Sequence, residues 1–222
     1  VQIEGRRVVV QAWQYDVVSP TGGTVPVIFL DTSSEENDPI DRPLTDKLYG
    51  GDHVHRFKQE VVLGIGGVRM LEELDVVVKK FHLNEGHASL LTLELLRQSK
   101  RDIEQVWDER LQWDDESVRE RCVFTTHTPV AAGHDKFGYD VVEQVLGDTV
   151  DMNILRELAG EDGLNMTLLA LNLSRYVNGV AKKHGEVSQN MFKGYAIHAI
   201  TNGIHSYTWT AEPFKQLFDR YI

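Results

Sequence analysis

The stretch VVVKKFHLNEGH, residues 76 to 87, decides the fold class, because an apolar run there gives way to polar and ring-bearing side chains. The same unit occurs twice more along the chain. Residues 122 to 124 (CVF) lead to residues 125 to 129 (TTHTP), and residues 196 to 200 (AIHAI) lead to residues 201 to 205 (TNGIH). Short apolar runs with β-branched residues, bounded by turn-forming residues, predict buried β-strands.

Helical patterns separate these three units. Residues 88 to 100 form one such segment, and residues 165 to 183 form a longer one. The longer segment places apolar side chains at steps of three and four, on one face of the expected helix: Met166, Ala170, Leu173, Val177 and Val180. Strands that alternate with helices predict an α/β fold with an open parallel sheet, in which ligand sites form just beyond the carboxyl ends of the strands. The three polar clusters are therefore expected to share one crevice.

The N-terminal segment follows a different pattern. Residues 8 to 18 and 25 to 30 are dense in β-branched and aromatic residues, and the turn-like sequence SPTGG lies between them, which predicts a β-hairpin. Residues 31 to 46 are polar and contain proline, which favours a surface loop. An apolar pattern resumes over residues 52 to 70 and predicts a helix that is interrupted by glycines.

Those glycines lie in LGIGGV, residues 63 to 68, which resembles part of a phosphate-binding loop. The segment does not complete G-x-G-x-x-G and lacks a following Lys-Ser or Lys-Thr pair. We therefore expect Gly64, Gly66 and Gly67 to allow a close helix packing contact. The sequence also contains no G-x-S-x-G motif, so it gives no support to a serine hydrolase.

Composition limits the partners and the compartment of the chain. The formal net charge of -11 argues against nucleic acid and anionic membrane surfaces as partners, because both are acidic and require an excess of Lys and Arg. The single cysteine, Cys122, excludes an intrachain disulfide framework and fits a reducing compartment. Neither a membrane-spanning apolar stretch nor a signal peptide is evident, so we expect a cytoplasmic protein.

Two of the polar clusters contain the main candidates for a binding site. The sequence NEGH, residues 84 to 87, puts an amide, a carboxylate and an imidazole at a strand-to-helix junction, where they can hold sugar hydroxyls. The alternative is that Asn84 or Glu85 only caps the following helix. His127 stands between a β-branched strand and a proline that forces the backbone out of the sheet, so we expect its ring to be exposed in the crevice. A purely structural histidine is the alternative at that position.

A metal site is a third interpretation of these clusters. They contain four histidines and a glutamate: His82, Glu85, His87, His127 and His205. Imidazole and carboxylate are common zinc ligands, but no pair among them has the i, i+4 relation by which one helix presents two ligands. We therefore favour a sugar site and expect no metal.

Five segments, taken in order, resemble the bacterial branch of the α-glucan (glycogen/maltodextrin) phosphorylases and cover well over half of the chain. They are LYGGDHVHRFKQEVVLGIGGVRML (residues 48 to 71), FHLNEGHASLLTLELLR (81 to 97), CVFTTHTPVAAGHDKF (122 to 137), NMTLLALNLSRYVNGVAKKHGEVSQNMF (165 to 192) and ITNGIHSYTW (200 to 209).

The resemblance implies that residues 1–222 are a partial N-terminal domain of a GT-B glycosyltransferase, with a Rossmann-like parallel sheet and flanking helices. Such enzymes use phosphate to release terminal α-1,4-linked glucose as glucose 1-phosphate, with pyridoxal phosphate as cofactor. The resemblance also implies that the cofactor lysine and the C-terminal domain are absent from this chain, so no cofactor-binding residue is expected in it. We expect the isolated chain to be inactive and to self-associate through the apolar face that the missing parts would cover.

The resemblance also assigns roles to individual residues. His127 matches the family's active-site histidine, which contacts the glucosyl unit being transferred and acts through electrostatics and position. Asn84 and Glu85 match an amide-carboxylate pair near the same site, and Asp52 matches a loop that gates the substrate entrance. The implied ligands are an α-1,4-glucan and phosphate. Two alternatives stay open, namely a glucan-binding or interaction module without chemistry and, with less support, a sugar-nucleotide-dependent GT-B transferase.

Overall fold

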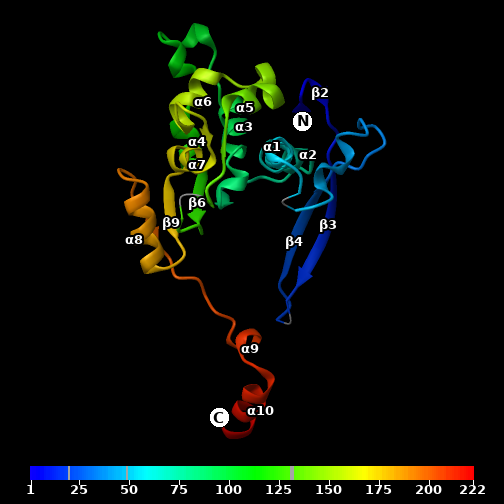
Figure 1. The fold of residues 1–222 in the computed structure, drawn as a ribbon, viewed down its shortest axis with the longest axis vertical. Helices are drawn as coiled ribbons and strands as arrows, with labels where there is room; N and C mark the ends of the chain where they lie inside the picture. Colours follow the sequence, from blue (N-terminus) through cyan, green and yellow to red (C-terminus); the bar gives the residue numbers. More distant parts are fainter. Residues whose placement is uncertain (20, 49, 131–132) are drawn as a thin grey trace.

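The computed structural model describes residues 1–19, 21–48, 50–130 and 133–222 (Figure 1). A four-stranded sheet lies in the main body of the chain, with the strand order β10-β9-β6-β5, and all three neighbouring pairs are parallel. Its strands are β5 (Phe81–Asn84), β6 (Cys122–Thr126), β9 (Tyr176–Gly179) and β10 (His198–Ala199). The parallel α/β sheet predicted from the alternating pattern is confirmed.

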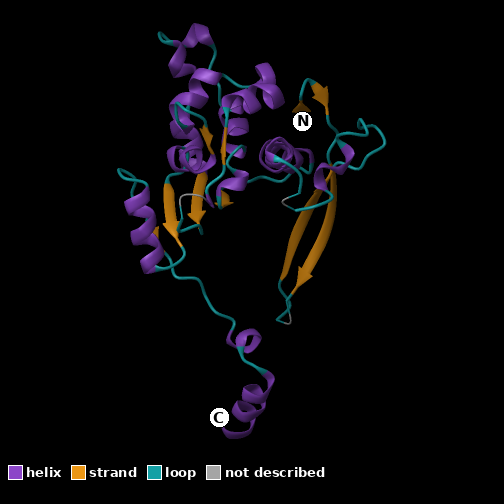
Figure 2. Cartoon of the chain, viewed as in Figure 1, coloured by secondary structure: helices purple, strands orange, loops and turns teal. Residues whose placement is uncertain are grey.

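The connections between these strands carry most of the helices, which surround the sheet (Figure 2). The α-helices of this part are α3 (Leu91–Gln98), α4 (Asp115–Arg121), α5 (Tyr139–Leu146), α6 (Met152–Ala159), α7 (Met166–Asn172) and α8 (Lys182–Met191). The short elements are η3 (Gly86–Ala88), η4 (Ile103–Gln105), η5 (Glu109–Gln112), η7 (Gly147–Thr149), β7 (Lys136–Phe137) and β8 (Leu164–Asn165). Helix α4 contacts β6, and α8 contacts both β9 and β10.

The hydrophobic core forms between the sheet and these helices. In β5, Phe81 and Leu83 are buried while His82 and Asn84 are exposed, which is the alternation expected of a strand with one covered face. In β6 the side chain of Phe124 is fully buried. Burial of such apolar surface is the dominant favourable contribution to folding.

The N-terminal part forms the predicted hairpin, which projects away from the main body (Figure 1). Its strands are β3 (Gln11–Val18) and β4 (Thr24–Asp31), and the small strands β1 (Gln2–Ile3) and β2 (Arg6–Arg7) precede them. The pairing is antiparallel and places Trp13 opposite Phe29. Both of these side chains are exposed, so the hairpin presents an uncovered aromatic face. Pro20 of the predicted turn and Tyr49 lie outside the described residues.

The helix predicted over residues 52 to 70 is confirmed, but its glycines do not interrupt it. Helix α1 (His53–Val61) continues through a π-helical segment (Val62–Gly66) into α2 (Gly67–Glu73). A β-carbon on Gly64 would lie 2.8 Å from the β-carbon of Leu90 and 2.8 Å from the backbone nitrogen of Leu91. The predicted close packing contact therefore exists at Gly64, where the helix crosses the segment that leads into α3.

Two sequence predictions about regular structure are wrong. Residues 165 to 183 do not form one long helix, because α7 ends at Asn172 and β9 follows. Val177 pairs with Phe124 in the sheet, so strand pairing overrides the helical spacing of the apolar residues. In the first unit, Val76 to Val78 lie outside the strand, which begins only at Phe81, and the side chain of Val77 is 89% exposed.

Residues 31 to 46 are packed more tightly than the surface loop that their composition favours. The side chain of Asn37 is buried, donates to the carbonyl oxygens of Val9 and Thr32, and accepts from the Val9 N–H. The short helix η1 (Arg42–Thr45) then buries Leu44. A polar side chain that satisfies three backbone groups replaces the apolar contacts that the sequence lacks here.

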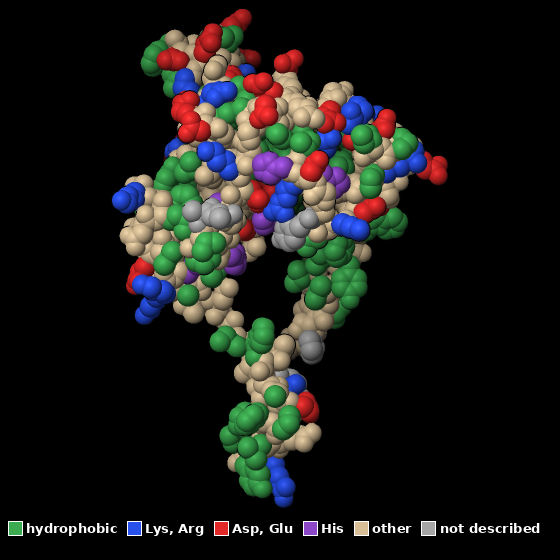
Figure 3. All heavy atoms as spheres, in the orientation of Figure 1, with side chains coloured by type: hydrophobic (Ala, Val, Ile, Leu, Met, Phe, Trp, Pro, Cys, Tyr) green, Lys and Arg blue, Asp and Glu red, His purple; other side chains and the backbone are tan. Residues whose placement is uncertain are grey.

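The C-terminal helices α9 (Ser206–Trp209) and α10 (Glu212–Tyr221) extend away from the main body (Figure 1). Hydrophobic side chains gather on this extension and on the hairpin (Figure 3). In α10 the side chains of Phe214, Leu217 and Phe218 are all exposed. Among the described residues, no helix has the length and apolar character needed to cross a membrane.

Candidate functional site

The carboxyl ends of β5 and β6 meet, because Asn84 pairs with Thr125 in the parallel ladder. The backbone N–H of Glu85 extends this pairing by donating to the Thr125 carbonyl oxygen at 2.9 Å. The two polar clusters that follow these strands are therefore brought side by side, as expected for strand ends at one edge of a parallel sheet.

His127 and Asn84 face each other across this edge. The Nε2 atom of His127 lies 2.8 Å from the Asn84 Oδ1 atom. Because a carboxamide oxygen only accepts, this contact requires a proton on Nε2 of the His127 ring. Both side chains are exposed, so a hydrogen-bonding ligand can reach them. The exposure predicted for His127 is confirmed.

Glu85 holds the backbone around His127. Its carboxylate accepts the His127 N–H at 2.7 Å, the Thr128 hydroxyl at 2.9 Å and the Thr126 hydroxyl at 3.3 Å. The side chain is buried, and no side-chain capping bond to η3 accompanies it. The capping alternative is therefore not what the structure shows for Glu85. Its oxygens face donors of the protein itself, and the substrate contact expected of this residue stays a prediction.

The backbone of Glu85 adopts a conformation that is rare for a residue with a side chain. Its φ is +65° and its ψ is 177°. This region is nearly restricted to glycine, and a residue held there costs about 1–3 kcal/mol. The three hydrogen bonds to the carboxylate offset that cost, and such strain is concentrated at functional sites.

A second row of hydrogen bonds runs across three strands below this edge. His82 Nε2 lies 2.7 Å from the Thr125 hydroxyl, which donates in turn to Asn178 Oδ1 at 3.1 Å. Asn178 is buried on β9. The sequence prediction missed Asn178 because it lay inside the segment expected to be helical. The available signal was the sequence YVNG, in which a β-branched residue precedes a polar residue and a glycine, as in TNG at residues 201 to 203.

The third polar cluster does not join the other two. His205 is exposed, and its Nδ1 atom contacts the Thr208 hydroxyl within the C-terminal extension. No described contact links it to Asn84, Glu85 or His127. Only two of the three clusters share a site in this structure, because β10 lies at the far edge of the sheet and the chain then runs away from it (Figure 1).

Asp52 lies at the N-terminus of α1. Its Oδ1 atom accepts the backbone N–H of His55 at 2.8 Å, which is the contact of a helix N-cap. The described contacts do not connect Asp52 directly to the His127 cluster. Its predicted role in gating the substrate entrance is not tested by this arrangement.

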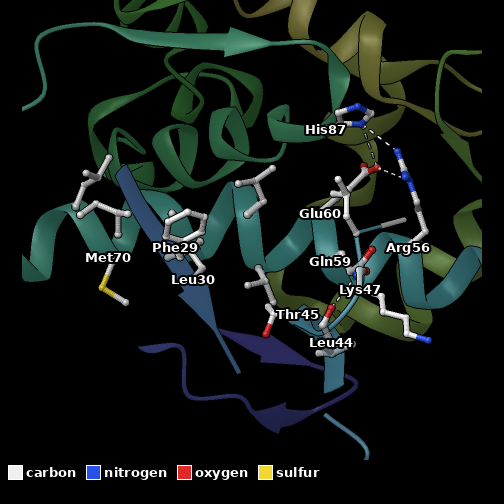
Figure 4. A pocket seen from close by; sticks show the side chains of 16 residues that line it. Phe29, Leu30, Leu44, Thr45, Lys47, Arg56, Gln59, Glu60, Met70 and His87 are labelled. Carbon is white, nitrogen blue, oxygen red and sulfur yellow. Dashed lines mark hydrogen bonds and ion pairs between the residues drawn. The ribbon is translucent and has the colours of Figure 1, made fainter. Parts of the chain in front are cut away.

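A charged cluster joins α1 to the turn after β5 (Figure 4). The guanidinium Nη2 of Arg56 lies 2.9 Å from Asp135 Oδ2 and 3.1 Å from His87 Nδ1, while its Nε lies 3.3 Å from Glu60 Oε1. His87 Nδ1 is also 3.2 Å from Asp135 Oδ2. Of these four residues, only His87 belonged to the candidates taken from the sequence.

The environment shifts the pKa values of three residues in this cluster. Burial raises the pKa of Glu60 to about 7, although His87 and Arg56 oppose the shift. The hydrogen bond to Asp135, together with Glu60, raises the pKa of His87 to about 9. Burial alone would raise the pKa of Asp135, but the hydrogen bonds from His87 and Arg56 outweigh this effect and lower the pKa to about 2. At neutral pH the cluster therefore contains two cations, one full anion and a carboxyl group near its midpoint.

Among the described residues, Glu60, His87 and Asp135 also place one ligand atom each within 4.8 Å of one another, as a metal site requires. Arg56 contacts all three, so the cation held between these groups here is the guanidinium. His82, Glu85, His127 and His205 do not belong to this group. The cluster is better described as an ion-pair network than as a metal centre.

One wall of this cluster opens into a cavity of about 520 Å³ between the hairpin and α1–α2. Phe29, Leu30 and Met70 line its apolar part, and Figure 4 shows Arg56, Glu60 and His87 together at its polar end. The rest of the cavity lining is mostly apolar.

Comparison with known proteins identifies the family of this chain. No protein-family model matches it. Maltodextrin phosphorylase of Thermococcus litoralis is 37% identical over 242 aligned residues, which cover 100% of this chain and 27% of that protein. Glycogen phosphorylase of Mycobacterium tuberculosis is 39% identical over 223 residues, which cover 88% of this chain and 25% of that protein. Glycogen phosphorylase of Aquifex aeolicus is 32% identical over 241 residues, which cover 100% of this chain and 33% of that protein.

The chain thus spans about a quarter to a third of the length of these curated relatives. The similarity extends through both strand units that form the His127 cluster, because the alignments with two of the relatives cover the chain completely. On this evidence the chain belongs to the α-glucan phosphorylase family.

Proposed function

We propose that residues 1–222 are part of the N-terminal GT-B domain of an α-glucan phosphorylase. The reaction of the complete enzyme is phosphorolysis, in which inorganic phosphate takes the terminal α-1,4-linked glucose from a glucan and glucose 1-phosphate is released. The names of the relatives support a glucan of the maltodextrin or glycogen type as substrate. The complete protein would work in the cytoplasm, where glucan and phosphate are both available.

The observation that carries this proposal is the fixed geometry around His127. Glu85 holds the His127 backbone N–H, and Asn84 holds one ring nitrogen, so the ring is presented at the strand edge in one orientation. An oriented imidazole and carboxamide suit the hydroxyl groups of a glucosyl unit. In the transition state, where positive charge develops on the sugar ring, such fixed dipoles stabilise it without reorganising.

The residues of this chain supply only part of the required chemistry. The proposal places the pyridoxal phosphate of the complete enzyme on residues outside this chain, as the family resemblance implies. The phosphate substrate also needs cationic groups, and Arg56 and His87, on the elements that join the site, are already paired with Asp135. We therefore expect the isolated chain to be inactive.

The test is phosphate-dependent release of glucose 1-phosphate from maltodextrin with pyridoxal phosphate present. The chain alone is compared with a longer polypeptide that carries the remaining length of the relatives. We expect activity only from the longer protein, and His127→Asn should reduce that activity by at least tenfold, the effect of losing about 1.4 kcal/mol of transition-state stabilisation. Full activity of His127→Asn would contradict the role given to the imidazole. Activity of the isolated chain would show that the essential groups are all within it.

A non-catalytic glucan-binding module would give a different result in the same assay. It would bind maltodextrin without releasing glucose 1-phosphate even as part of the longer protein. A sugar-nucleotide-dependent transferase would consume a nucleotide sugar and not phosphate. The names of the relatives favour the phosphorylase over both alternatives.

A further inference from the structure

Strand β3 forms an open edge of the N-terminal hairpin. The other strand, β4, contacts the π-helical segment Val62–Gly66, whereas β3 lies on the side of the hairpin away from the main body (Figure 1). Within β3 only Ala12 is partly buried, and every other side chain is exposed. The described part of the chain places no further strand beside β3. One row of its backbone groups is therefore left without a partner strand.

The register of the hairpin shows which backbone groups form this row. The Ser19 N–H donates to the Gly23 carbonyl oxygen at 2.7 Å, which continues the pairing of Val18 with Thr24. Hydrogen-bonded and non-hydrogen-bonded positions alternate in an antiparallel pair, so the odd-numbered residues of β3 bond to β4. The N–H and C=O groups that point to the open edge are those of the even-numbered residues: Ala12, Gln14, Asp16 and Val18.

The edge of β4 is less suited to pairing with another strand. One of its outward positions is Pro26, which lies opposite Asp16 and has no N–H to donate. Proline and charged side chains are common protections of an edge strand against other chains. Strand β3 contains no proline, glycine or lysine, and Asp16 is its one charged residue. An exposed edge of this kind is a template for a further strand.

We propose that β3 is the interface for a second copy of this chain. The copy adds its own β3 in antiparallel orientation, which joins two two-stranded hairpins into one continuous sheet. Such an interface is isologous, because the same surface of both copies meets across a twofold axis. A hairpin of two strands is only marginally stable in water, so each copy gains from the added strands. The inference concerns association and does not depend on the proposed function.

Self-complementarity selects Tyr15 as the centre of this pairing. Gln14 then lies opposite Asp16 of the partner subunit, and Ala12 lies opposite Val18 of the partner subunit. Every outward N–H and C=O group of β3 thereby gains a partner. A register centred on Asp16 would set two carboxylates opposite each other, which is destabilising. A register centred on Gln14 would leave Val18 opposite a residue that precedes the strand.

The side chains of one hairpin face fit the same register. Trp13, Tyr15 and Val17 share this face, and they are between 47% and 63% exposed. With Tyr15 at the centre, the two Tyr15 rings lie side by side, and Trp13 lies opposite Val17 of the partner subunit. Aromatic pairs and pairs of an aromatic with a β-branched residue are favourable across strands. The register that satisfies the backbone therefore also matches these side chains.

The first test is disulfide formation in the complete 222-residue chain, with oxidised glutathione as oxidant. Tyr15→Cys sets two thiols at the twofold axis, in a non-hydrogen-bonded pair whose Cα atoms are about 4.5 Å apart, which a disulfide can bridge. We expect a covalent dimer. Val25→Cys is the matched control, because Val25 is 64% exposed but lies on β4, away from the axis. The native Cys122 is buried, so it should not cross-link.

The second test is sedimentation equilibrium of chains that also carry Phe214→Ser and Phe218→Ser, which removes association through α10. Gln14→Pro deletes an outward N–H and breaks no bond to β4. It should raise the dimer dissociation constant by about tenfold, because the symmetric interface loses the hydrogen bond twice. Thr24→Pro is the matched control, since the Thr24 N–H points to the opposite edge of the hairpin.

Three results would each overturn the proposal. One is that Tyr15→Cys gives no more covalent dimer than Val25→Cys. Another is an equal dissociation constant for Gln14→Pro and Thr24→Pro. The third is a cross-link in the isolated chain that does not form in the longer polypeptide, because the rest of that protein would then cover the edge of β3. None of these readouts uses glucan phosphorolysis, so failure of the interface and failure of the proposed function are distinguishable.

Discussion

The carboxylate of Glu85 accepts the backbone N–H of His127 at 2.7 Å, although the two residues are 42 positions apart in the sequence. This bond joins the turns that follow two adjacent parallel strands. It holds the one histidine that both the strand pattern and the family resemblance select as functional. Glu85 therefore positions His127 from within the protein, whatever ligand the site binds.

Replacing this carboxylate should weaken the fold locally. In Glu85→Gln the amide group would face N–H and O–H donors with one acceptor oxygen in place of two. We expect the free energy of unfolding to fall by about 1–3 kcal/mol, the cost of leaving a buried donor unsatisfied. Chemical denaturation of both proteins measures this difference. The exposed Glu73→Gln is the control, and a Glu85→Gln protein as stable as that control would contradict the assigned role.

A side chain at Gly64 should be destabilising despite the gain in helix propensity. The new β-carbon of Gly64→Ala would lie 2.8 Å from both Leu90 and Leu91, so the helix and the segment before α3 must separate. Overpacking of this kind costs about 1–3 kcal/mol. Gly203→Ala is the matched control, since a β-carbon there meets nothing within 4 Å. Thermal melts that rank the two variants equally would refute the close contact.

The charged cluster predicts a stability maximum at mildly acidic pH. Glu60 and His87 have folded-state pKa values raised from 4.5 to about 7 and from 6.5 to about 9. The folded state therefore binds more protons than the unfolded state, and stability falls as pH rises from about 4.5 to 9. Asp135 acts in the opposite direction, because its pKa is lowered from 3.8 to about 2, and its contribution is lost as pH falls through that range.

Denaturant midpoints measured from pH 3 to pH 10 test this profile. In Glu60→Gln the part of the decline between pH 4.5 and 7 should disappear, because the group that titrates there is gone. The decline that belongs to His87 should remain because Asp135 still raises its pKa, but it should end at a lower pH, since Glu60 also raises the pKa of His87. A wild-type profile that rises across the whole range from pH 5 to 9 would contradict the raised pKa values.

The apolar face of α10 should cause the isolated chain to associate. Phe214, Leu217 and Phe218 are exposed on one amphipathic helix, and water-exposed patches of this kind favour protein contacts. We expect analytical ultracentrifugation to show a mass that increases with protein concentration. The double variant Phe214→Ser with Phe218→Ser should shift the chain toward the monomer, while Gln216→Ser should not. A wild-type monomer at every concentration would contradict the prediction.

The local pattern of apolar and polar residues predicted much of the architecture. It failed where a segment becomes a strand because a neighbouring strand pairs with it. The apolar run at residues 122 to 124 lies in the parallel sheet as predicted, whereas in the first unit the strand begins only at Phe81, after the valine run expected to form it. Val177 has the spacing of a helical face, yet it lies in a strand because β6 offers it a partner. An apolar spacing of three and four residues describes only one face, whereas strand pairing is decided by a neighbour that is distant in sequence.

The candidate site shows the same division. The sequence alone selected Asn84, Glu85 and His127, because polar residues at the ends of strands meet at one edge of a parallel sheet. It also identified the family, since matching segments run through the whole chain in a fixed order. These conclusions depend on residue types and on their order, both of which are properties of the sequence.

Only the tertiary structure decided which groups contact each other. It turned the Glu85 carboxylate toward the His127 backbone, left His205 outside the site, and brought Arg56 to Asp135 across 79 positions of sequence. Hydrogen bonds and ion pairs act over about 3 Å and require defined angles. The sequence can therefore supply the chemical groups of a site, but the folded backbone alone determines their distances and orientations.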